Sequence, residues 1–374
     1  MESRSYTLEE LPSHLENRDE RDPSLLPVSP LRLQSYLHNP RALPTDRVLF
    51  EMREGKRLIA YRTLLPDHFY DESGNPRRFA WLSGNFVLPE YRRKGISTQL
   101  LQQAEARWEG QLMYTNYAPA SKAVYDRTGQ FRLLASREGA RFYLRAAFAE
   151  LLRNRLGDSP GLRSADKLIN LLVNFRLKRY TLLSDNHGIT GVKGNAMDQF
   201  KVTRMEEMDR SMKTLIREYN GSSLFRRDAK VLKWILHFPW VTDAPVPDIP
   251  YHFSYRSAQF ENMLLKIEAV NGRDNGFLWL VVHGRRLSVP YLFTTNEKLF
   301  PMMARLCMDT IIRRDLAHVT VRHEGLRNEL RLFRKWFLSI RSMPQLIFVH
   351  RSIHGTLPGT FALQDGDGDV VFTG

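Results

Sequence analysis

Cysteine is almost missing from this chain, and long apolar runs are missing altogether. Cys307 is the only cysteine among 374 residues, so an intramolecular disulfide and a thiolate metal site are both excluded. The longest apolar runs, such as 277–282, have about the length of a strand, whereas a membrane-spanning helix needs ~20 apolar residues. The acidic first 30 residues lack the apolar stretch of a secretory signal. We therefore expect a cytoplasmic protein with no transmembrane segment and no metal.

Acidic residues are also scarce relative to basic ones. The sequence has 55 Lys and Arg against 41 Asp and Glu, which gives a formal net charge of +14. Such an excess favours polyanionic partners: nucleic acid, phosphorylated cofactors, acidic carrier proteins or anionic lipid. Charge alone does not choose among these partners.

The length predicts about two domains. Residues 1–30 are polar and show no sustained period, so we predict a flexible acidic arm. The region 31–146 is predicted to form the first domain, a mixed α/β layer with the element order β-β-β-α-β-α-β-β. Its expected strands are 48–52, 57–64, 79–88 and 112–115, its helices 98–108 and 119–128, and its closing hairpin joins 131–136 to 141–144 around Glu138 and Gly139.

Residues 147–196 are predicted to be a helical linker, with helices at 147–156 and 164–178. In the second helix Ala165, Leu168, Ile169, Leu172 and Phe175 share one face, which we expect to pack between the domains, although a helix lying on a membrane surface has the same pattern. The region 197–374 repeats the element order of the first domain, so we predict a second α/β domain of the same build.

The stretch 87–98 lies between a predicted strand and a predicted helix. A turn in this position directs backbone N–H groups and the positive end of the helix dipole at one spot. Gly95 permits unusual backbone dihedrals, and Arg92, Arg93 and Lys94 add three positive charges. Together these features predict a pyrophosphate cradle. The stretch lacks the G-x-x-x-x-G-K-[ST] pattern of a nucleotide P-loop.

At this stretch the sequence resembles the GNAT superfamily of acyl-CoA-dependent N-acyltransferases. The family pattern of a strand, V-x-P-x-Y/F-R-x-x-G-[IVL]-[GAS] and a helix is filled by Val87, Pro89, Tyr91, Arg92, Gly95, Ile96 and Ser97. A second segment, 116–131, is similar to the family's N-x-x-A-x-x-x-Y-x-x-x-G-F pattern, with short insertions. The resemblance covers about 48–144.

The resemblance implies a site and a mechanism. Acetyl-CoA or another acyl-CoA would bind in the first domain as co-substrate, and an amine would attack its thioester directly in a ternary complex, with the acceptor between the two domains. Tyr125 would protonate the leaving thiolate, and Asn116 would bind pantetheine or a water molecule. The cofactor-binding residues implied are Phe86, Val87, Leu88, Arg92, Arg93, Lys94, Gly95, Ile96, Ser97, Thr98, Asn116 and Ser121.

The sequence does not identify a general base. Glu51, Asp71 and Glu72 are candidates only by family position. The acidic run 365–369 begins like a calcium loop, but Val370 stands where that loop needs glycine, so we predict a tight hairpin turn.

In the second domain, the segment 294–298 follows a predicted strand but contains neither glycine nor an arginine pair. The second domain therefore resembles a degenerate GNAT domain, and we expect a single cofactor site in the first. The predicted function is acyl transfer from CoA to a small or carrier-bound amine, with an anionic acceptor favoured by the basic charge. Two alternatives stay open: a Fem-like aminoacyl-tRNA-dependent transferase, and a non-catalytic acyl-CoA sensor.

Overall fold

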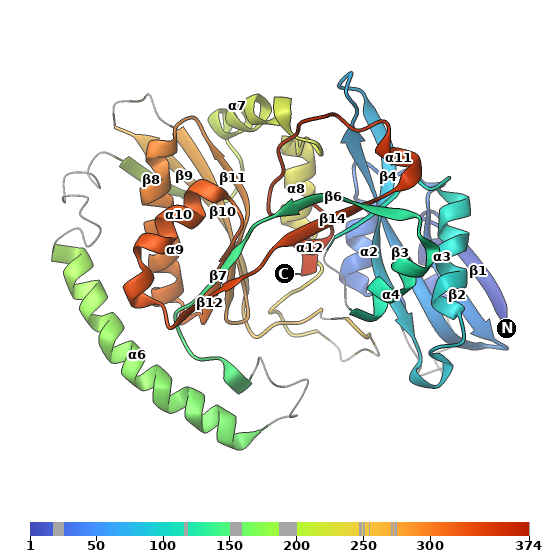
Figure 1. Cartoon of the computed structure of the whole chain (residues 1–374), viewed down its shortest axis with the longest axis horizontal. Helices are drawn as coiled ribbons and strands as arrows, with labels where there is room; N and C mark the ends of the chain where they lie inside the picture. The colour runs from blue at the N-terminus through green and yellow to red at the C-terminus, as the bar shows by residue number, and fades with distance from the viewer. Residues whose placement is uncertain are drawn as a thin grey trace. The chain divides into compact units, whose positions relative to one another are not determined.

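The computed structural model describes residues 1–17, 26–115, 119–149, 159–186, 200–246, 249, 251–253, 255–270, 272 and 275–373. They form two compact units, and neither is continuous in sequence. The first unit contains 1–136, 216–258 and 345–374, and the second contains 137–215 and 259–344. Each unit is built on a mixed sheet of seven strands (Figure 1). The predicted fold class, two GNAT-like α/β domains in tandem, is thereby confirmed.

The first sheet has the strand order β1-β2-β3-β4-β5-β14-β6. Only the β4–β5 pair is identified as parallel among its described ladders, and β1 to β4 are joined in antiparallel fashion. The strands are β1 (Glu2–Thr7), β2 (Arg47–Glu54), β3 (Arg57–Tyr70), β4 (Pro76–Val87), β5 (Leu112–Thr115), β14 (Gln345–His350) and β6 (Phe131–Arg137).

Helices α3 (Ile96–Arg107) and α4 (Pro119–Thr128) share one hydrophobic core with this sheet. On α3, Leu100, Leu101 and Ala104 are fully buried, and these positions recur at the spacing of one helix face. The other helices of the first unit are α1 (Leu11–Glu16), α2 (Pro30–Leu37), α8 (Ala229–His237), α11 (Arg351–His354) and α12 (Val370–Thr373), with short 3-10 turns η1 (Pro89–Tyr91) and η3 (Asn220–Ser222).

The predicted closing hairpin is wrong, because its two strands belong to different sheets. β6 lies at the edge of the first sheet, whereas β7 (Ala140–Tyr143) lies in the second. β14, from near the end of the chain, pairs with β5 in the place next to β6. A two-residue hairpin needs positive φ angles, and Gly139 is not among the glycines that have one. Gly139 instead admits close backbone packing, since a Cβ there would lie 2.2 Å from Met343 O.

The described part of the predicted arm is ordered. β1 pairs with β2 from Glu2 to Thr7, and the α1 side chain of Leu11 is fully buried. β1 is an edge strand, and one of its faces stays in solvent, so its sequence can be rich in polar residues. The division into 31–146 and 197–374 also differs from the compact units, because 216–258 and 345–374 pack with the first.

The second sheet has the order β13-β7-β12-β11-β10-β9-β8. Its remaining strands are β13 (Ser339–Ser342), β12 (His318–Val321), β11 (Arg286–Thr294), β10 (Asn275–His283), β9 (Phe260–Ala269) and β8 (Phe200–Met205). Its core includes Leu278 and Leu280 of β10 and the apolar face of α9. The helices are α6 (Pro160–Asn186), α9 (Phe300–Arg313) and α10 (Glu324–Leu332), with η4 (Glu297–Leu299) and η5 (Arg334–Trp336); α7 (Arg210–Tyr219) spans the division between the units.

Helix α6 packs on the second unit through a different face from the one predicted. Val173 and Leu177 are buried in the core of that unit, whereas Leu168, Leu172 and Phe175 are 65%, 67% and 69% exposed. The buried positions are offset by one residue from the predicted face, so Ile169 still packs against the core. The buried face also carries Asp166 and Asn170, so the apolar period of the helix alone favoured the wrong face. Most of the other predicted linker helix, 147–156, lies outside the described residues.

Within the described residues, no helix combines the length and the hydropathy that crossing a bilayer requires.

A buried ionic cluster joins distant parts of the first unit. Asp67 on β3 accepts hydrogen bonds from Arg41 (2.6 Å), Arg227 (2.9 Å) and Trp81 (2.7 Å), and Arg227 also donates to Asp367 at 3.2 Å. Burial raises the pKa of Asp67, but the charges of Arg227 and Arg41 outweigh it and hold that pKa well below its usual range. The cluster therefore ties the segments around 227 and 367 to the first sheet.

We expect Asp67→Asn to destabilise the protein by about 3–5 kcal/mol, because it leaves the buried Arg41 guanidinium without a balancing charge and Arg227 with Asp367 alone. A carboxyl whose pKa is lowered by folding stabilises the native state above its unfolded pKa, so this contribution declines as pH falls below about 4. Urea unfolding at pH 7 measures the loss. Asp126→Asn is the control: its exposed pair with Lys122 is worth at most about 1 kcal/mol. Equal effects of the two substitutions would contradict the assignment.

Candidate functional site

The loop between β4 and α3 forms an open helix N-terminus. Gly95 is the N-cap of α3 and has a left-handed backbone (φ 80°, ψ −3°), and no side chain caps the helix there. A Cβ built at Gly95 would meet nothing within 4 Å. The first backbone N–H groups of a helix lack partners within the helix, and they attract anions when nothing else caps them. This geometry fits the predicted pyrophosphate cradle.

The three cations of this loop are exposed beside Gly95. Arg92 donates from Nε to Val87 O at 3.1 Å, and the Lys94 ammonium lies 4.9 Å from the Tyr91 ring centre. Arg93 has a positive φ of 62°, which is uncommon outside glycine and turns the loop sharply. The loop therefore presents positive charge to solvent around the free end of α3.

The first turn of α3 is fastened to β4. Ile96 is buried in the core, Thr98 is partly exposed, and Ser97 Oγ accepts a hydrogen bond from Asn85 Nδ2 at 2.9 Å. Asn85 was not predicted as a site residue. An amide in the middle of an apolar strand was the signal available in the sequence.

β4 and β5 diverge immediately before the loop. Their parallel ladder contains the pairs Ala80–Leu112 and Trp81–Met113, and a bulge on β4 at Ser83 shifts its register with β3. Bulges bend a strand and end its pairing locally. Beyond Trp81 the β5-facing backbone edge of β4 is therefore suited to receive an extended ligand as an added strand.

The predicted pantetheine strand lies in this diverging part of β4. Phe86 is buried, and Val87 and Leu88 are partly exposed. Leu88 donates its backbone N–H to Ile59 O at 2.9 Å on the β3 side. These residues come after the bulge at Ser83 and before the turn at Gly95, so the strand edge leads into the predicted cradle.

Tyr125 of α4 is buried against β5, where its ring stacks on Tyr114 with centroids 4.2 Å apart. Its hydroxyl accepts a hydrogen bond from Arg62 Nη1 at 3.3 Å. Arg62 is itself buried on β3, and its Nε and Nη2 atoms have no hydrogen-bond partner among the described residues. A buried cation at this hydroxyl would stabilise negative charge that develops beside it. Arg62 was not predicted, although an arginine within the apolar run 58–65 was a visible signal.

The second motif, 116–131, supplies two further predicted cofactor-binding residues, Asn116 and Ser121. Asn116 lies outside the described residues. Ser121 is partly exposed in the first turns of α4.

Two of the proposed bases already have ionic partners. Glu51 is fully buried and contacts His14 (3.0 Å) and Arg53 (2.8 Å). Asp71 accepts from Asn75 N and pairs with Arg77, and the backbone hydrogen bond is the main cause of its lowered pKa. Both carboxylates therefore serve local structure.

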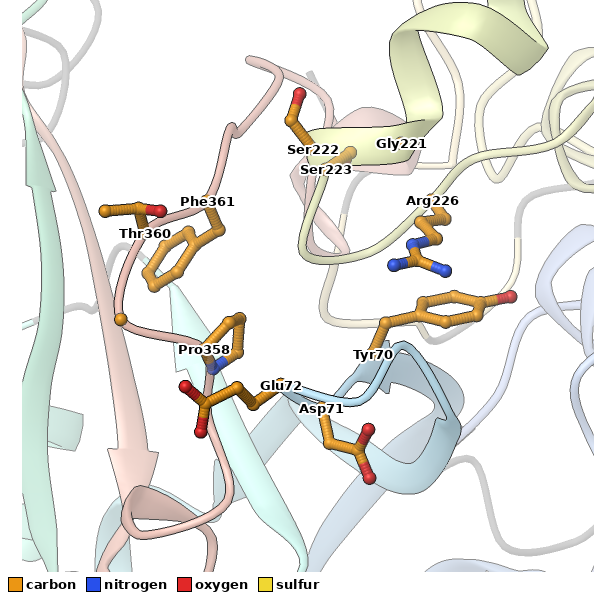
Figure 2. Close-up of a pocket in the computed structure, with 11 residues that line it drawn as sticks. Tyr70, Asp71, Glu72, Gly221, Ser222, Ser223, Arg226, Pro358, Thr360 and Phe361 are labelled. Carbon is orange, nitrogen blue, oxygen red and sulfur yellow. The ribbon is translucent and has the colours of Figure 1, made fainter.

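Glu72, the third proposed base, lines a cavity of about 380 Å³ together with Tyr70 and Asp71 (Figure 2). The Arg226 guanidinium lies 4.2 Å from the ring centre of Tyr70 on another wall of this cavity. Tyr70 pairs with Pro76, whereas Ala60 pairs with Val87 beside the cradle. Ten residues of strand separate Ala60 from Tyr70, roughly 33 Å, so the cavity is distinct from the cradle.

The matching junction of the second unit is closed. After β11, the side chain of Asn296 accepts from Lys298 N and caps η4, and Asn296 has an extended backbone with φ −150°. A capped turn without glycine or clustered arginine has no cradle for a diphosphate.

Among the described residues, no group of three or more His, Cys, Asp or Glu side chains could hold a metal ion.

Comparison with known proteins agrees with this geometry. The acetyltransferase (GNAT) family matches residues 13–129. Aminoglycoside N(6')-acetyltransferase type 1 from Acinetobacter baumannii is 53% identical over 47 residues, which are 13% of this chain and 30% of that relative. The chain thus matches less than a third of the length of this curated relative.

Among solved structures, Saccharomyces cerevisiae N-myristoyltransferase with bound myristoyl-CoA is similar in fold, with a TM-score of 0.50 and 10% identity over 93% of this chain and 82% of that chain. A GCN5-related N-acetyltransferase from Kribbella flavida has a TM-score of 0.45 and 14% identity over 92% and 70% of the two chains. Residues 13–129 contain the cradle, the diverging strands and Tyr125. The part of the chain that matches the acetyltransferase (GNAT) family is thus the part that holds the open N-terminus of α3 and Tyr125.

Proposed function

We propose that this protein transfers an acetyl or longer acyl group from CoA to an amine by direct attack within a ternary complex. The observation that supports this most strongly is the uncapped N-terminus of α3 at Gly95, directly after the strand that diverges from β5. The cradle, the strand edge and Tyr125 come from consecutive elements of one domain. Their order follows the length of an acyl-CoA molecule from diphosphate to thioester.

The binding roles follow from the geometry. The N–H groups at the start of α3, with Arg92, Arg93 and Lys94, would hold the diphosphate. The free edge of β4 near Phe86 and Val87 would hydrogen-bond the pantetheine arm, and a backbone N–H there would polarise the thioester carbonyl.

Tyr125 is the proposed general acid for the leaving thiolate. Because Arg62 donates to its hydroxyl oxygen, the hydroxyl hydrogen remains available for the sulfur of CoA. The unpartnered nitrogen atoms of Arg62 would also stabilise the thiolate and the tyrosinate formed after proton transfer.

The net charge of +14 favours a neutral or anionic amine as acceptor. A polycationic aminoglycoside would be repelled, although one relative is named for that substrate class. The test is a panel of acceptors with acetyl-CoA: glucosamine 6-phosphate, glucosamine, a short peptide with a free amine and an aminoglycoside. Acetyl-CoA binding without turnover of any amine would favour the sensor, and salt-sensitive tRNA binding would favour the Fem-like transferase.

We expect Gly95→Glu to reduce CoA affinity at least tenfold, because its carboxylate would stand beside the diphosphate. Gly95→Gln is the matched control, since it imposes the same strain at φ 80° and fills the same open space without charge. Titration calorimetry with CoA measures both variants. Equal losses would show backbone strain alone, and unchanged affinity in Gly95→Glu would refute the cradle.

We expect Tyr125→Phe to lower kcat by about 10²–10⁴, the usual contribution of a general acid, with little change in CoA affinity. The phenyl ring keeps the stacking on Tyr114 and removes only the hydroxyl group. Steady-state kinetics and calorimetry on the same preparation make the comparison. Full turnover in Tyr125→Phe would exclude it as the acid.

A further inference from the structure

The segment before α12 lies against the point where β4 and β5 diverge. Asp369 accepts a hydrogen bond from Ser83 Oγ at 2.7 Å, and Ser83 is the bulge residue just past the last β4–β5 pair. Gly368 has φ 108°, and a Cβ there would come within 2.9 Å of Thr115, the last residue of β5. Asp369 therefore lies at the residues that border the divergence on both strands.

Ion pairing holds this segment in place. Asp367 accepts the backbone N–H of Gln364 at 2.7 Å and the guanidinium of Arg227 at 3.2 Å. The acidic run 365–369 forms a turn, but this turn leads into α12 and is not the predicted hairpin. Asp367 anchors the turn, and Asp369 is presented to the sheet.

Asp369 and Tyr125 approach the sheet from opposite faces. On β3, Arg62 contacts Tyr125, whereas the next residue, Thr63, accepts a hydrogen bond from Arg32 of α2. Arg32 also donates to Ser83. On β5, Tyr114 stacks on Tyr125 while the next residue, Thr115, meets Gly368. Successive side chains of a strand point to opposite faces, so both strands give the same result.

The surroundings of Asp369 suit a group that exchanges protons near neutrality. Burial raises its pKa to about 6, although the Ser83 hydrogen bond and the charge of Arg32 oppose that rise. Arg32 is the charged group that faces Asp369 from α2. Arg32 also donates hydrogen bonds to the hydroxyl groups of Tyr36 and Tyr251. Asp369 keeps partial solvent exposure.

We propose that Asp369 is the general base that removes a proton from the acceptor amine, on the face of the sheet opposite Tyr125. This proposal rests on the proposed acyl transfer and adds the base that the sequence did not identify. It also places the acceptor on the face formed by α2 and the segment 364–369.

The proton balance is complete. The Asp369 carboxylate takes one proton from the ammonium group, and the free nitrogen lone pair forms the C–N bond at the thioester carbon. The C–S bond breaks, the sulfur takes a proton from Tyr125, and the amide nitrogen loses its second proton to the tyrosinate through solvent. Asp369 then releases its proton to water, so the sum is one amide, one thiol and one proton.

The test compares Asp369→Asn with the wild-type protein, using acetyl-CoA and two small amines. Ethylamine is protonated at pH 7, whereas trifluoroethylamine is largely neutral and needs no deprotonation before attack. We expect Asp369→Asn to lower kcat/KM for ethylamine by about 10²–10⁴ and to affect trifluoroethylamine much less. A purely structural role would slow both amines equally, which would overturn the proposal.

The pH profile supplies a second measurement. A base with a pKa of about 6 is ionised above that pH, so wild-type kcat/KM should fall as pH drops below 6. Ser83→Ala removes a hydrogen bond that favours the ionised carboxylate, so the acidic limb should move to higher pH. An unmoved limb would contradict the assignment.

Failure of this proposal can be told from failure of the proposed function. If the wild type acetylates both amines and Asp369→Asn slows them equally, only the role of Asp369 fails. If CoA binds but the wild type acetylates neither amine and no member of the acceptor panel, the proposed function fails and the base assignment fails with it. Calorimetry with CoA on Asp369→Asn verifies that the variant is folded.

Discussion

The parting of β4 from β5 is the feature on which the rest of the site depends. Two parallel pairs join these strands, and the bulge at Ser83 then turns β4 away. A regular sheet would have used the backbone groups of β4 for internal hydrogen bonds. Divergence instead leaves a strand edge that leads into the open end of α3.

Buried charged residues hold the segments around this part of the sheet together. Asp67 and Asp367 share Arg227, and Arg32 binds Ser83 and Thr63 within the first unit. Buried ion pairs add little net stability but strongly penalise any conformation that separates the partners. They therefore suit a site in which a segment near residue 369 must stay against strands formed near residue 83.

The two units are built on similar sheets but differ at the turn that follows the matching strand. Both contain a seven-stranded mixed sheet, yet α3 begins at an uncapped glycine and the corresponding turn of the second unit is capped by Asn296. A side-chain cap satisfies a backbone N–H group that an anion would otherwise bind. The two units therefore differ at this helix end and not in the kind of sheet.

The sequence by itself determined the local features: strand, turn and helix around Gly95, the three cations beside it, and the helix that presents Tyr125. These depend on neighbouring residues, so their spacing along the chain was enough. Only the tertiary structure decided that β7 joins the second sheet and β14 the first, and which face of α6 is exposed. It also decided that Arg62 contacts Tyr125 and that Asp369 contacts Ser83. Their partners lie far away in sequence, and a single chain read in order has no period or spacing that reports which distant segments pack together.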